Sequence, residues 1–265
     1  MDEDPAQPDK ATELLRLHRE PDLLTVVNVW DVVSARVVAE VEGTRALATA
    51  SHSIAASRGY EDGENIPVEE MIREVGLIAA STSLPVTADL EGGYGDAAET
   101  VRRAIGAGIV GANIEDQMKP VPQAAAQVEA VMRVAAQEGV PDFVLNARTD
   151  AFLRALGEGA ADPSAVLADA VERGRAFLDA GAPVVFVPGI LEEEQVATLA
   201  EAFGPQRLTT IGIPGNPDNA RLQELGVARV SYGPIPQRVA LTALAKLVES
   251  VHSGGGVPPD TRPLN

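Results

Sequence analysis

The sequence predicts one domain over residues 1–265, folded as a closed (β/α)8 barrel of the TIM type. First, segments with strand character alternate with segments of helical spacing along almost the whole chain, which is typical of a parallel sheet covered by helices. Second, about eight strand–helix units fit a chain of this length. Third, the strands are nearly continuous apolar runs, as expected where both faces of a sheet are buried. An open, doubly wound sheet is the rival fold, but it would more often have fewer strands.

The predicted strands are short apolar runs that end at polar residues, glycine or proline. The first contains Val26, Val27 and Val29 and ends at Trp30, and β-branched residues of this kind favour strands. In chain order the strands are expected at residues 23–30, 45–51, 86–90, 109–115, 143–147, 184–187, 208–213 and 228–232.

The predicted helices are marked by their termini as well as by apolar spacing. Ser34 can cap a helix that Gly43 stops, Pro67 suits a first helical turn, and Gly181 follows the end of another helix. The helices are expected at residues 12–19, 34–41, 67–81, 97–107, 126–138, 164–180, 192–203, 219–225 and 239–251. Residues 1 to about 10 and 253–265 are expected to be flexible tails, since they are rich in proline, glycine or charge.

Composition excludes several classes of function. The formal net charge of −18 argues against nucleic acid or an anionic membrane surface as a partner. The chain has no cysteine, which excludes disulfides, thiolate metal sites and cysteine nucleophiles. The acidic N-terminus is unlike a signal peptide, and no apolar run approaches the roughly 20 residues of a membrane helix. We therefore expect a cytoplasmic protein.

Carboxylates follow two neighbouring predicted strands at the point where each strand ends. Asp89 and Glu91 come after one strand, and Glu115 ends the next. Because the carboxyl ends of parallel strands meet at one edge, these side chains should form an acidic cluster. Hard carboxylate oxygens suit Mg²⁺, with Mn²⁺ as a possible substitute. The alternative is a pair of polar loop starts that hold no metal.

An arginine at the end of the fifth predicted strand should face this cluster, because active sites of such barrels lie at the C-terminal strand ends. Arg148 can grip a carboxylate or phosphonate through two parallel hydrogen bonds. The alternative is a structural ion pair with Asp150 or Glu115. The sequence therefore predicts a pocket for a small anion that bridges a metal ion and a guanidinium group.

Three other strand-end residues are candidates for substrate binding. Ser51 has no obvious His–Asp relay, so hydrogen bonding is favoured over nucleophilic attack; the backbone amides of His52 and Ser53, which follow it, would complete an anion pocket. For the lone His52, a packing or hydrogen-bonding role is the alternative to chemistry. Trp30 can form a substrate wall, although tryptophan is more often a core residue.

The chain resembles the isocitrate lyase and phosphoenolpyruvate mutase superfamily over about residues 20–250. Five stretches in the right order carry the resemblance: Asn28-Val29-Trp30-Asp31; Thr49-Ala50-Ser51 with Ile54 to Ser57; Gly59 to Glu64; Val86 to Gly95 with Asn113 to Asp116; and Asn146 to Ala151.

The resemblance implies a barrel whose last helix is swapped between subunits of a homodimer or homotetramer. It implies Mg²⁺ and a small 2-oxo or 2-hydroxy acid, which reacts through a metal-stabilised enolate. By motif, Asp89 would bind the metal directly, and Glu91 and Glu115 would hold its waters. Ser51, with the amides of His52 and Ser53, would bind the substrate carboxylate. Arg148 would bind anionic groups, and Asp62 would lie on a mobile catalytic segment.

The chain also departs from this pattern. Lyases of the superfamily carry a Cys-Gly-His loop after the Glu-Asp pair, whereas this chain has the loop 117–123 and no cysteine. Lys119 is the basic residue of that loop, and it would reach the substrate if the loop closed; a solvent-facing lysine is the alternative. His52, where relatives usually have a small residue, could narrow the pocket or act as an acid or base.

We therefore expect a Mg²⁺-dependent lyase or decarboxylase acting on a small 2-oxo or 2-hydroxy mono- or dicarboxylic acid. Oxaloacetate decarboxylation is a concrete case, since it needs no cysteine acid. The alternatives are phosphonopyruvate chemistry, of the mutase or hydrolase type, and a barrel that binds a 2-oxo acid with little turnover.

Overall fold

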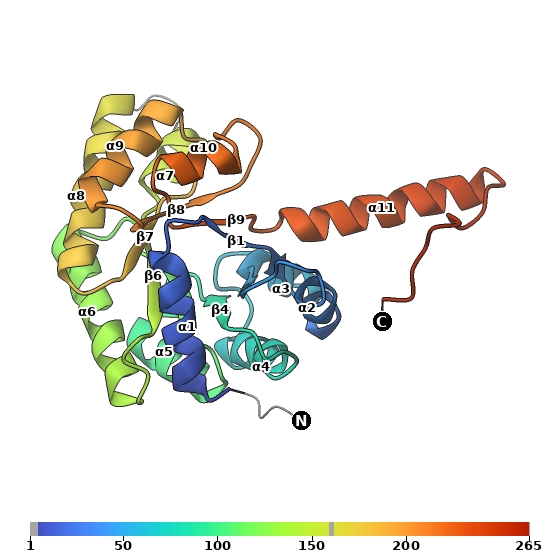
Figure 1. Ribbon diagram of the computed structural model, residues 1–265, viewed down its shortest axis with the longest axis horizontal. Coiled ribbons are helices and arrows are strands. Elements are labelled where there is room, and N and C mark those ends of the chain that lie inside the picture. Colours follow the sequence, from blue (N-terminus) through green and yellow to red (C-terminus); the bar gives the residue numbers. More distant parts are fainter. Residues whose placement is uncertain (1–4, 159–161, 265) are drawn as a thin grey trace.

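The computed structural model describes residues 5–158 and 162–264, and it confirms the barrel (Figure 1). All nine strands are parallel and lie in the order β1-β9-β8-β7-β6-β5-β4-β3-β2. Their bounds are β1 Leu24–Val26, β2 Asn28–Val29, β3 Leu47–Thr49, β4 Val86–Asp89, β5 Gly111–Glu115, β6 Val144–Arg148, β7 Val184–Phe186, β8 Leu208–Ile211 and β9 Arg229–Ser231. Because only Val27 separates β1 from β2, the two edges of the sheet nearly meet, and the first predicted strand is in fact two short ones.

The helices from α2 to α10 lie between strands along the chain and cover the outside of the barrel, whereas α1 precedes the first strand and α11 follows the last (Figure 1). They are α1 Gln7–Arg19, α2 Val32–Ala39, α3 Ser51–Ser57, α4 Val68–Ala79, α5 Ala97–Gly106, α6 Val121–Gln137, α7 Ala151–Glu158, α8 Pro163–Asp179, α9 Glu193–Phe203, α10 Asn219–Glu224 and α11 Ile235–His252. Two of them, α3 and α7, were not predicted. The cap expected at Ser34 is instead Asp31, whose carboxylate accepts a hydrogen bond from the Ser34 amide at 2.7 Å, so α2 begins earlier.

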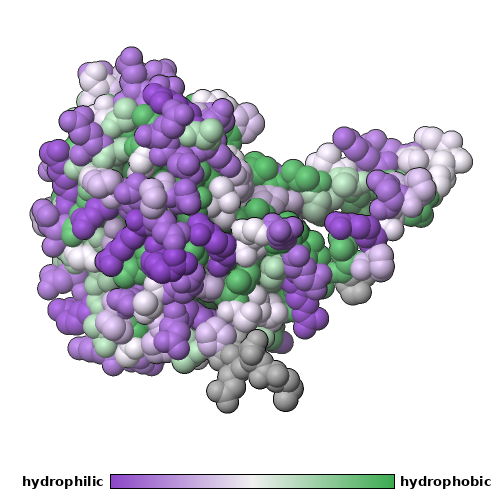
Figure 2. Space-filling view, viewed as in Figure 1, coloured by the Kyte–Doolittle hydropathy of each residue, from purple (hydrophilic) through white to green (hydrophobic). Residues whose placement is uncertain are grey.

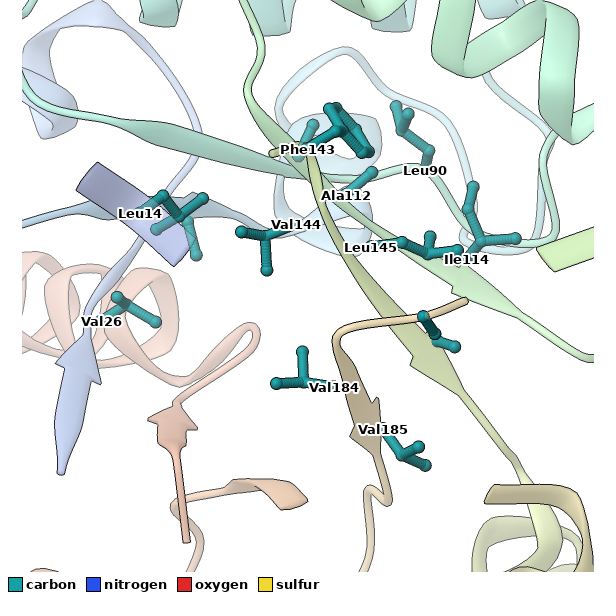
Figure 3. Close-up of a cluster of buried hydrophobic side chains, with 14 of the residues drawn as sticks. Leu14, Val26, Leu90, Ala112, Ile114, Phe143, Val144, Leu145, Val184 and Val185 are labelled. Carbon is teal, nitrogen blue, oxygen red and sulfur yellow. The ribbon is translucent and has the colours of Figure 1, made fainter. Parts of the chain in front are cut away.

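The N-terminal helix closes one end of the barrel core. Leu14 of α1 lies beside Val26, the last residue of β1, and Val144, the first residue of β6 (Figure 3). A Cβ at Gly111 would lie 2.9 Å from Leu14 Cδ2 and 2.8 Å from the carbonyl oxygen of Val144, so the close approach of this helix requires glycine at that position.

The expected N-terminal tail is wrong from Gln7 onward. The Gln7 side chain donates hydrogen bonds to the carbonyl oxygens of Ile105 at 2.7 Å and Ile109 at 3.0 Å, which ties the start of α1 to the barrel. Residues 1–4 of the expected tail lie outside the described residues, as does residue 265 of the C-terminal one. Residues 254–264 contain neither helix nor strand.

The last helix projects away from the barrel (Figures 1 and 2). Near its start, the Gln237 side chain donates to the Ser53 carbonyl oxygen at 3.0 Å and to the Ser57 hydroxyl at 2.9 Å. Beyond that anchor, large apolar side chains are exposed: Val239, Leu241, Leu244, Val248 and Val251. Within the described ranges, no helix combines the length and apolar character needed to cross a bilayer.

Candidate active site

A cavity of about 220 Å³ opens at the C-terminal ends of the strands. This is the end at which barrels of this type place their active sites. Its polar and charged lining comes mainly from β2 to β6 and the loops that follow them, and its apolar lining mainly from β7 to β9 and from α7. The lining residues are Asn28, Ala50, Ser51, His52, Asp62, Asp89, Asn113, Glu115, Arg148, Leu153, Phe186, Pro188, Gly189, Ile211, Ile213, Ser231, Gly233 and Pro234.

Asp89 ends β4 and is held by the start of the neighbouring helix. Its Oδ2 accepts hydrogen bonds from the Ser51 amide at 3.1 Å and the Ser51 hydroxyl at 2.8 Å. Ser51 is the first residue of α3, where backbone amides have no partner within the helix and attract negative charge. The Asp89 amide donates to the Thr49 hydroxyl at 3.0 Å. The other oxygen, Oδ1, is buried and has no hydrogen-bond partner among the described residues.

Glu115 and Arg148 stand opposite each other on β5 and β6. Nη1 of Arg148 lies 2.6 Å from Oε1 of Glu115, and Nε donates to Oδ1 of Asp150 at 2.7 Å. Both ion pairs that the sequence left open are therefore formed. The pKa of Glu115 is raised to about 8. Burial is the main cause, the nearby carboxylates of Asp150 and Asp89 add to it, and the positive charge of Arg148 opposes it.

Glu91 joins two loops above the site. It accepts hydrogen bonds from the Tyr94 hydroxyl at 3.0 Å and from the Glu64 amide, while the Tyr94 amide donates to the Glu64 carboxylate at 2.7 Å. All three residues have positive φ, of 61° at Glu64, 52° at Glu91 and 53° at Tyr94. Non-glycine residues hold such backbone only when their surroundings fix it, and they concentrate at functional sites. Burial raises the pKa of Glu91.

The predicted metal ligands lie in one region but do not form a ready-made cage. In the part of the chain that the structure describes, no three His, Cys, Asp or Glu side chains are arranged around a common cation position. Glu115 faces Arg148, and Glu91 faces the two loops. The donor set nevertheless suits a hard cation, because Oδ1 of Asp89 is buried without a hydrogen-bond partner among the described residues, and burial together with the negative charge of Asp89 raises the pKa of Glu91 and of Glu115.

The other predicted site residues separate into two groups. His52 and Asp62 line the cavity, and Nδ1 of His52 is buried with no hydrogen-bond partner among the described residues. Ser53 is buried, and its amide donates to the Ala50 carbonyl oxygen at 3.1 Å, which closes the first turn of α3. Trp30 packs against the core, and Lys119 donates to the Gln127 side chain at 2.8 Å. Neither lines the cavity.

The sequence interpretation assigned no role to a polar layer inside the barrel. Asn146 donates to Asn113 at 2.7 Å and accepts from the Thr209 hydroxyl at 2.6 Å. Arg229 of β9 is also fully buried, and none of its three side-chain nitrogens has a hydrogen-bond partner among the described residues. The signal for Arg229 was present in the sequence, since a charged residue within a predicted buried strand is costly and needs a reason.

A model of the phosphoenolpyruvate phosphomutase family matches residues 14–252. The chain belongs to this family. An uncharacterized protein of Mycobacterium tuberculosis is 32% identical over 248 residues, which cover 91% of this chain and 90% of the relative. An oxaloacetate decarboxylase of Paraburkholderia xenovorans is 29% identical over 241 residues, covering 90% and 80%. A Burkholderia cenocepacia crystal structure, provisionally described as a phosphonomutase, has a TM-score of 0.85 and 38% identity, covering 94% of this chain and 100% of that one.

Family membership confirms the resemblance read from the motifs. Members with named activities include carbon–carbon lyases and mutases, and several act on small organic acids such as oxaloacetate and methylisocitrate. This member of the phosphoenolpyruvate phosphomutase family is therefore an enzyme of the isocitrate lyase and phosphoenolpyruvate mutase superfamily.

Proposed function

We propose that this enzyme is a divalent-metal-dependent lyase that acts on a small 2-oxo or 2-hydroxy acid through an enolate, with Mg²⁺ as the metal and Mn²⁺ as a substitute. The observation that carries the proposal is the buried, partnerless Oδ1 of Asp89, whose other oxygen is fixed by Ser51. A buried carboxylate oxygen without a partner is costly. A hard cation with its remaining waters would satisfy it.

Asp89 would hold the metal directly, and Glu91 and Glu115 would hold its waters. When bound, the metal would supply Lewis-acid stabilisation of negative charge on an oxygen of the substrate. Glu115 now faces Arg148 at 2.6 Å, so a cation beside Glu115 would compete with the guanidinium for that carboxylate. The metal would thus interact with Glu115 and the substrate with Arg148, which in the protein alone form an ion pair with each other.

Arg148 would bind the substrate carboxylate. Its Nε and Nη1 are engaged by Asp150 and Glu115, and both bonds hold the guanidinium plane at the mouth of β6. The Phe186 ring centroid lies 6.0 Å from Cζ of Arg148, at the distance of a cation–π contact, and limits the movement of the group further. A guanidinium fixed in this way loses little additional freedom on binding an anion.

His52 and Asp62 are the proposed proton carriers, since both line the cavity and the chain has no cysteine. Lys119 was also a candidate, but its ammonium group is bound to Gln127 outside the cavity, so its catalytic role would require the loop to move. Ser51 would act mainly by orienting Asp89, because its hydroxyl already donates to that carboxylate.

Oxaloacetate is the simplest test substrate, because its decarboxylation needs only chelation and electron withdrawal into an enolate. We expect pyruvate release well above the metal-only background, dependent on Mg²⁺, and abolished in Asp89→Ala. The exposed carboxylate variant Asp22→Ala is the matched control. Arg148→Lys should raise KM, because the planar fork is lost although the charge remains. Release no faster than with free Mg²⁺ would dismiss this substrate, and activity retained in Asp89→Ala would remove Asp89 from the metal site.

Phosphonopyruvate chemistry remains the second candidate, because the family and the provisional phosphonomutase structure include it. A ³¹P NMR spectrum recorded after incubation with phosphonopyruvate and Mg²⁺ distinguishes phosphonopyruvate chemistry from the lyase reaction. A new phosphorus signal that needs Asp89 would establish it in place of the lyase reaction. Metal-dependent binding of 2-oxo acids without any turnover would instead favour a binding barrel.

We also propose that the enzyme is a homodimer or homotetramer in which α11 packs against a neighbouring subunit. The support is the exposed apolar side of α11, on which Leu241 and Leu244 are each 55% exposed, and the projection of the helix from the barrel (Figure 1).

A further inference from the structure

The two walls of the cavity differ in chemistry. The wall built by the ends of β2 to β6 and the loops after them carries the carboxylates, the guanidinium, the side-chain amides and the Ser51 hydroxyl, and a second hydroxyl, that of Ser231, lies at the end of β9. The opposite wall is built by α7 and by the ends of β7 and β8, and it presents Leu153, Phe186, Pro188, Ile211 and Ile213. A substrate held by its carboxylate at Arg148 and its oxygen near Asp89 would direct its remaining atoms toward this apolar wall.

The charges of the lining limit how many anionic groups the cavity can hold. Among the described residues that line it, Arg148 is the only permanent cation, whereas Asp62, Asp89 and Glu115 are acidic. Arg229, the other arginine of the barrel interior, is enclosed and is not a lining residue. The positive charges of a divalent cation and Arg148 would therefore be balanced by one chelating carboxylate and the carboxylates of the protein. A second substrate carboxylate at the apolar wall would have no cationic partner.

An unpaired carboxylate against such a wall would lose its hydration without compensation. An alkyl group in the same place would gain the free energy of apolar burial. Phe186 has only 5% of its surface exposed, so it presents a largely buried apolar surface to the cavity. The cavity volume of about 220 Å³ lies below the roughly 300–1,000 Å³ of typical ligand pockets, which suits a small acid.

We propose that the substrate of this enzyme carries a single carboxylate, next to its 2-oxo or 2-hydroxy group, and that its remaining part is an uncharged alkyl group seated on Phe186, Ile211 and Ile213. This inference rests on the proposed function, since it assumes that the acid end binds at the metal and Arg148. Oxaloacetate stays useful as a probe of the chemistry, because the carboxylate that would face the wall leaves as neutral CO₂ and its negative charge passes, with the bonding electron pair, to the enolate oxygen at the other end of the substrate.

Two acids of matched shape test the inference. Malate and 2-hydroxy-4-methylpentanoate share the 2-hydroxy acid end. At the other end malate carries a carboxylate, and 2-hydroxy-4-methylpentanoate carries an uncharged isopropyl group of similar size. Neither can decarboxylate by the proposed route. Lactate provides the acid end alone. Titration calorimetry of the full chain with each acid, with and without Mg²⁺, gives the three affinities.

We expect 2-hydroxy-4-methylpentanoate to bind roughly tenfold to a hundredfold more tightly than malate, in a Mg²⁺-dependent manner. The variant Ile211→Lys, which places a cation on the wall, should reverse the preference, and the size-matched control Ile211→Leu should keep it. If that lysine variant does not fold, the comparison of the two acids on the native enzyme still decides.

Malate binding as tightly as its alkyl counterpart, or more tightly, would overturn the inference. If lactate still bound in a Mg²⁺-dependent manner, tight malate binding would contradict only the inference about the alkyl group and not the proposed function. If none of the three acids bound in the presence of Mg²⁺, the inference would fail, and pyruvate release from oxaloacetate would decide the proposed function separately.

Discussion

Ser51 donates two hydrogen bonds to a single oxygen of Asp89, from its amide at 3.1 Å and from its hydroxyl at 2.8 Å. The bonds cross from the first residue of α3 to the last residue of β4 and leave the second oxygen of Asp89 without a partner among the residues that the structure describes. Ser51 thus fixes the direction in which Asp89 can offer a ligand.

Removal of the Ser51 hydroxyl should weaken metal binding without unfolding the enzyme. Groups that orient a metal ligand typically contribute about tenfold to a hundredfold in affinity, so Ser51→Ala should raise the Kd for Mn²⁺ by that factor in a calorimetric titration. Ser81→Ala is the matched control, because the Ser81 hydroxyl donates only to a local carbonyl oxygen, that of Ile78. An unchanged Kd in Ser51→Ala would show that the amide alone holds Asp89.

His18 should make the enzyme less stable in mild acid. Burial, with a further contribution from the positive charge of Arg229, lowers the pKa of His18 to about 3, while in the unfolded chain it is about 6.5. At pH values between these two pKa values, His18 is protonated in the unfolded chain but not in the folded enzyme. Its contribution to the free energy of unfolding therefore falls as the pH falls. From about pH 7 to about pH 5 the loss should be on the order of 2 kcal/mol.

The variant His18→Gln tests this origin, since glutamine can still donate to the Leu14 carbonyl oxygen, which lies 2.8 Å from Nδ1 of His18, but does not titrate. Urea unfolding at several pH values should show a flatter dependence in the variant. An equal slope in both proteins would assign the acid sensitivity to other groups.

The unpartnered guanidinium of Arg229 should cost stability. A buried charge without a hydrogen-bond partner is costly, and the Arg229 nitrogens have none among the described residues, so Arg229→Met should not lower the free energy of unfolding. Arg173 is the matched contrast: it is also buried, but it contacts Asp116 at 3.2 Å and Asp169 at 3.0 Å. Arg173→Met should destabilise by about 3–5 kcal/mol.

Urea unfolding at one pH compares the two arginine variants directly. If Arg229→Met were as destabilising as Arg173→Met, ordered water would have to satisfy the Arg229 guanidinium in the folded enzyme.

The exposed side of α11 should hold subunits together. Light scattering coupled to gel filtration should give the mass of a dimer or tetramer for the native chain and that of a monomer for the double variant Leu241→Glu, Leu244→Glu, because two buried carboxylates would oppose association. Lys246→Glu adds a carboxylate to another part of the same helix and should not change the mass. A native chain that runs as a monomer would contradict the proposed packing of α11.

Much of the fold could be read from the sequence, because β-branched runs and glycine or proline boundaries repeat along the chain. The two missed helices have local reasons. The short α3 begins with Ser51, His52 and Ser53, which favour caps and turns, and it forms because Asp89 and Gln237 engage its two ends. The other, α7, directly follows a site loop and leaves Leu153 and Leu156 exposed, so its apolar face does not mark it as a core helix.

The polar half of the site was also predictable, since strand ends meet at one edge and Ser51, Asp89, Glu115 and Arg148 each end or follow a strand. The apolar half was not. Phe186 and Ile211 look like any other strand residue, and only the register of β7 and β8 shows that they face the cavity. The sequence did not indicate that the Lys119 side chain donates to Gln127, because that partner lies within the following helix.

The most direct test of the central claim is the anomalous diffraction of Mn²⁺ in crystals grown with oxalate, a two-carbon mimic of an enolate acid end. We predict one strong peak in the barrel cavity at ligand distance from Oδ1 of Asp89, with oxalate between the metal and Arg148, and no such peak in Asp89→Ala. A native crystal with no peak beside Asp89, or with the metal bound elsewhere, would contradict the proposed metal-dependent chemistry.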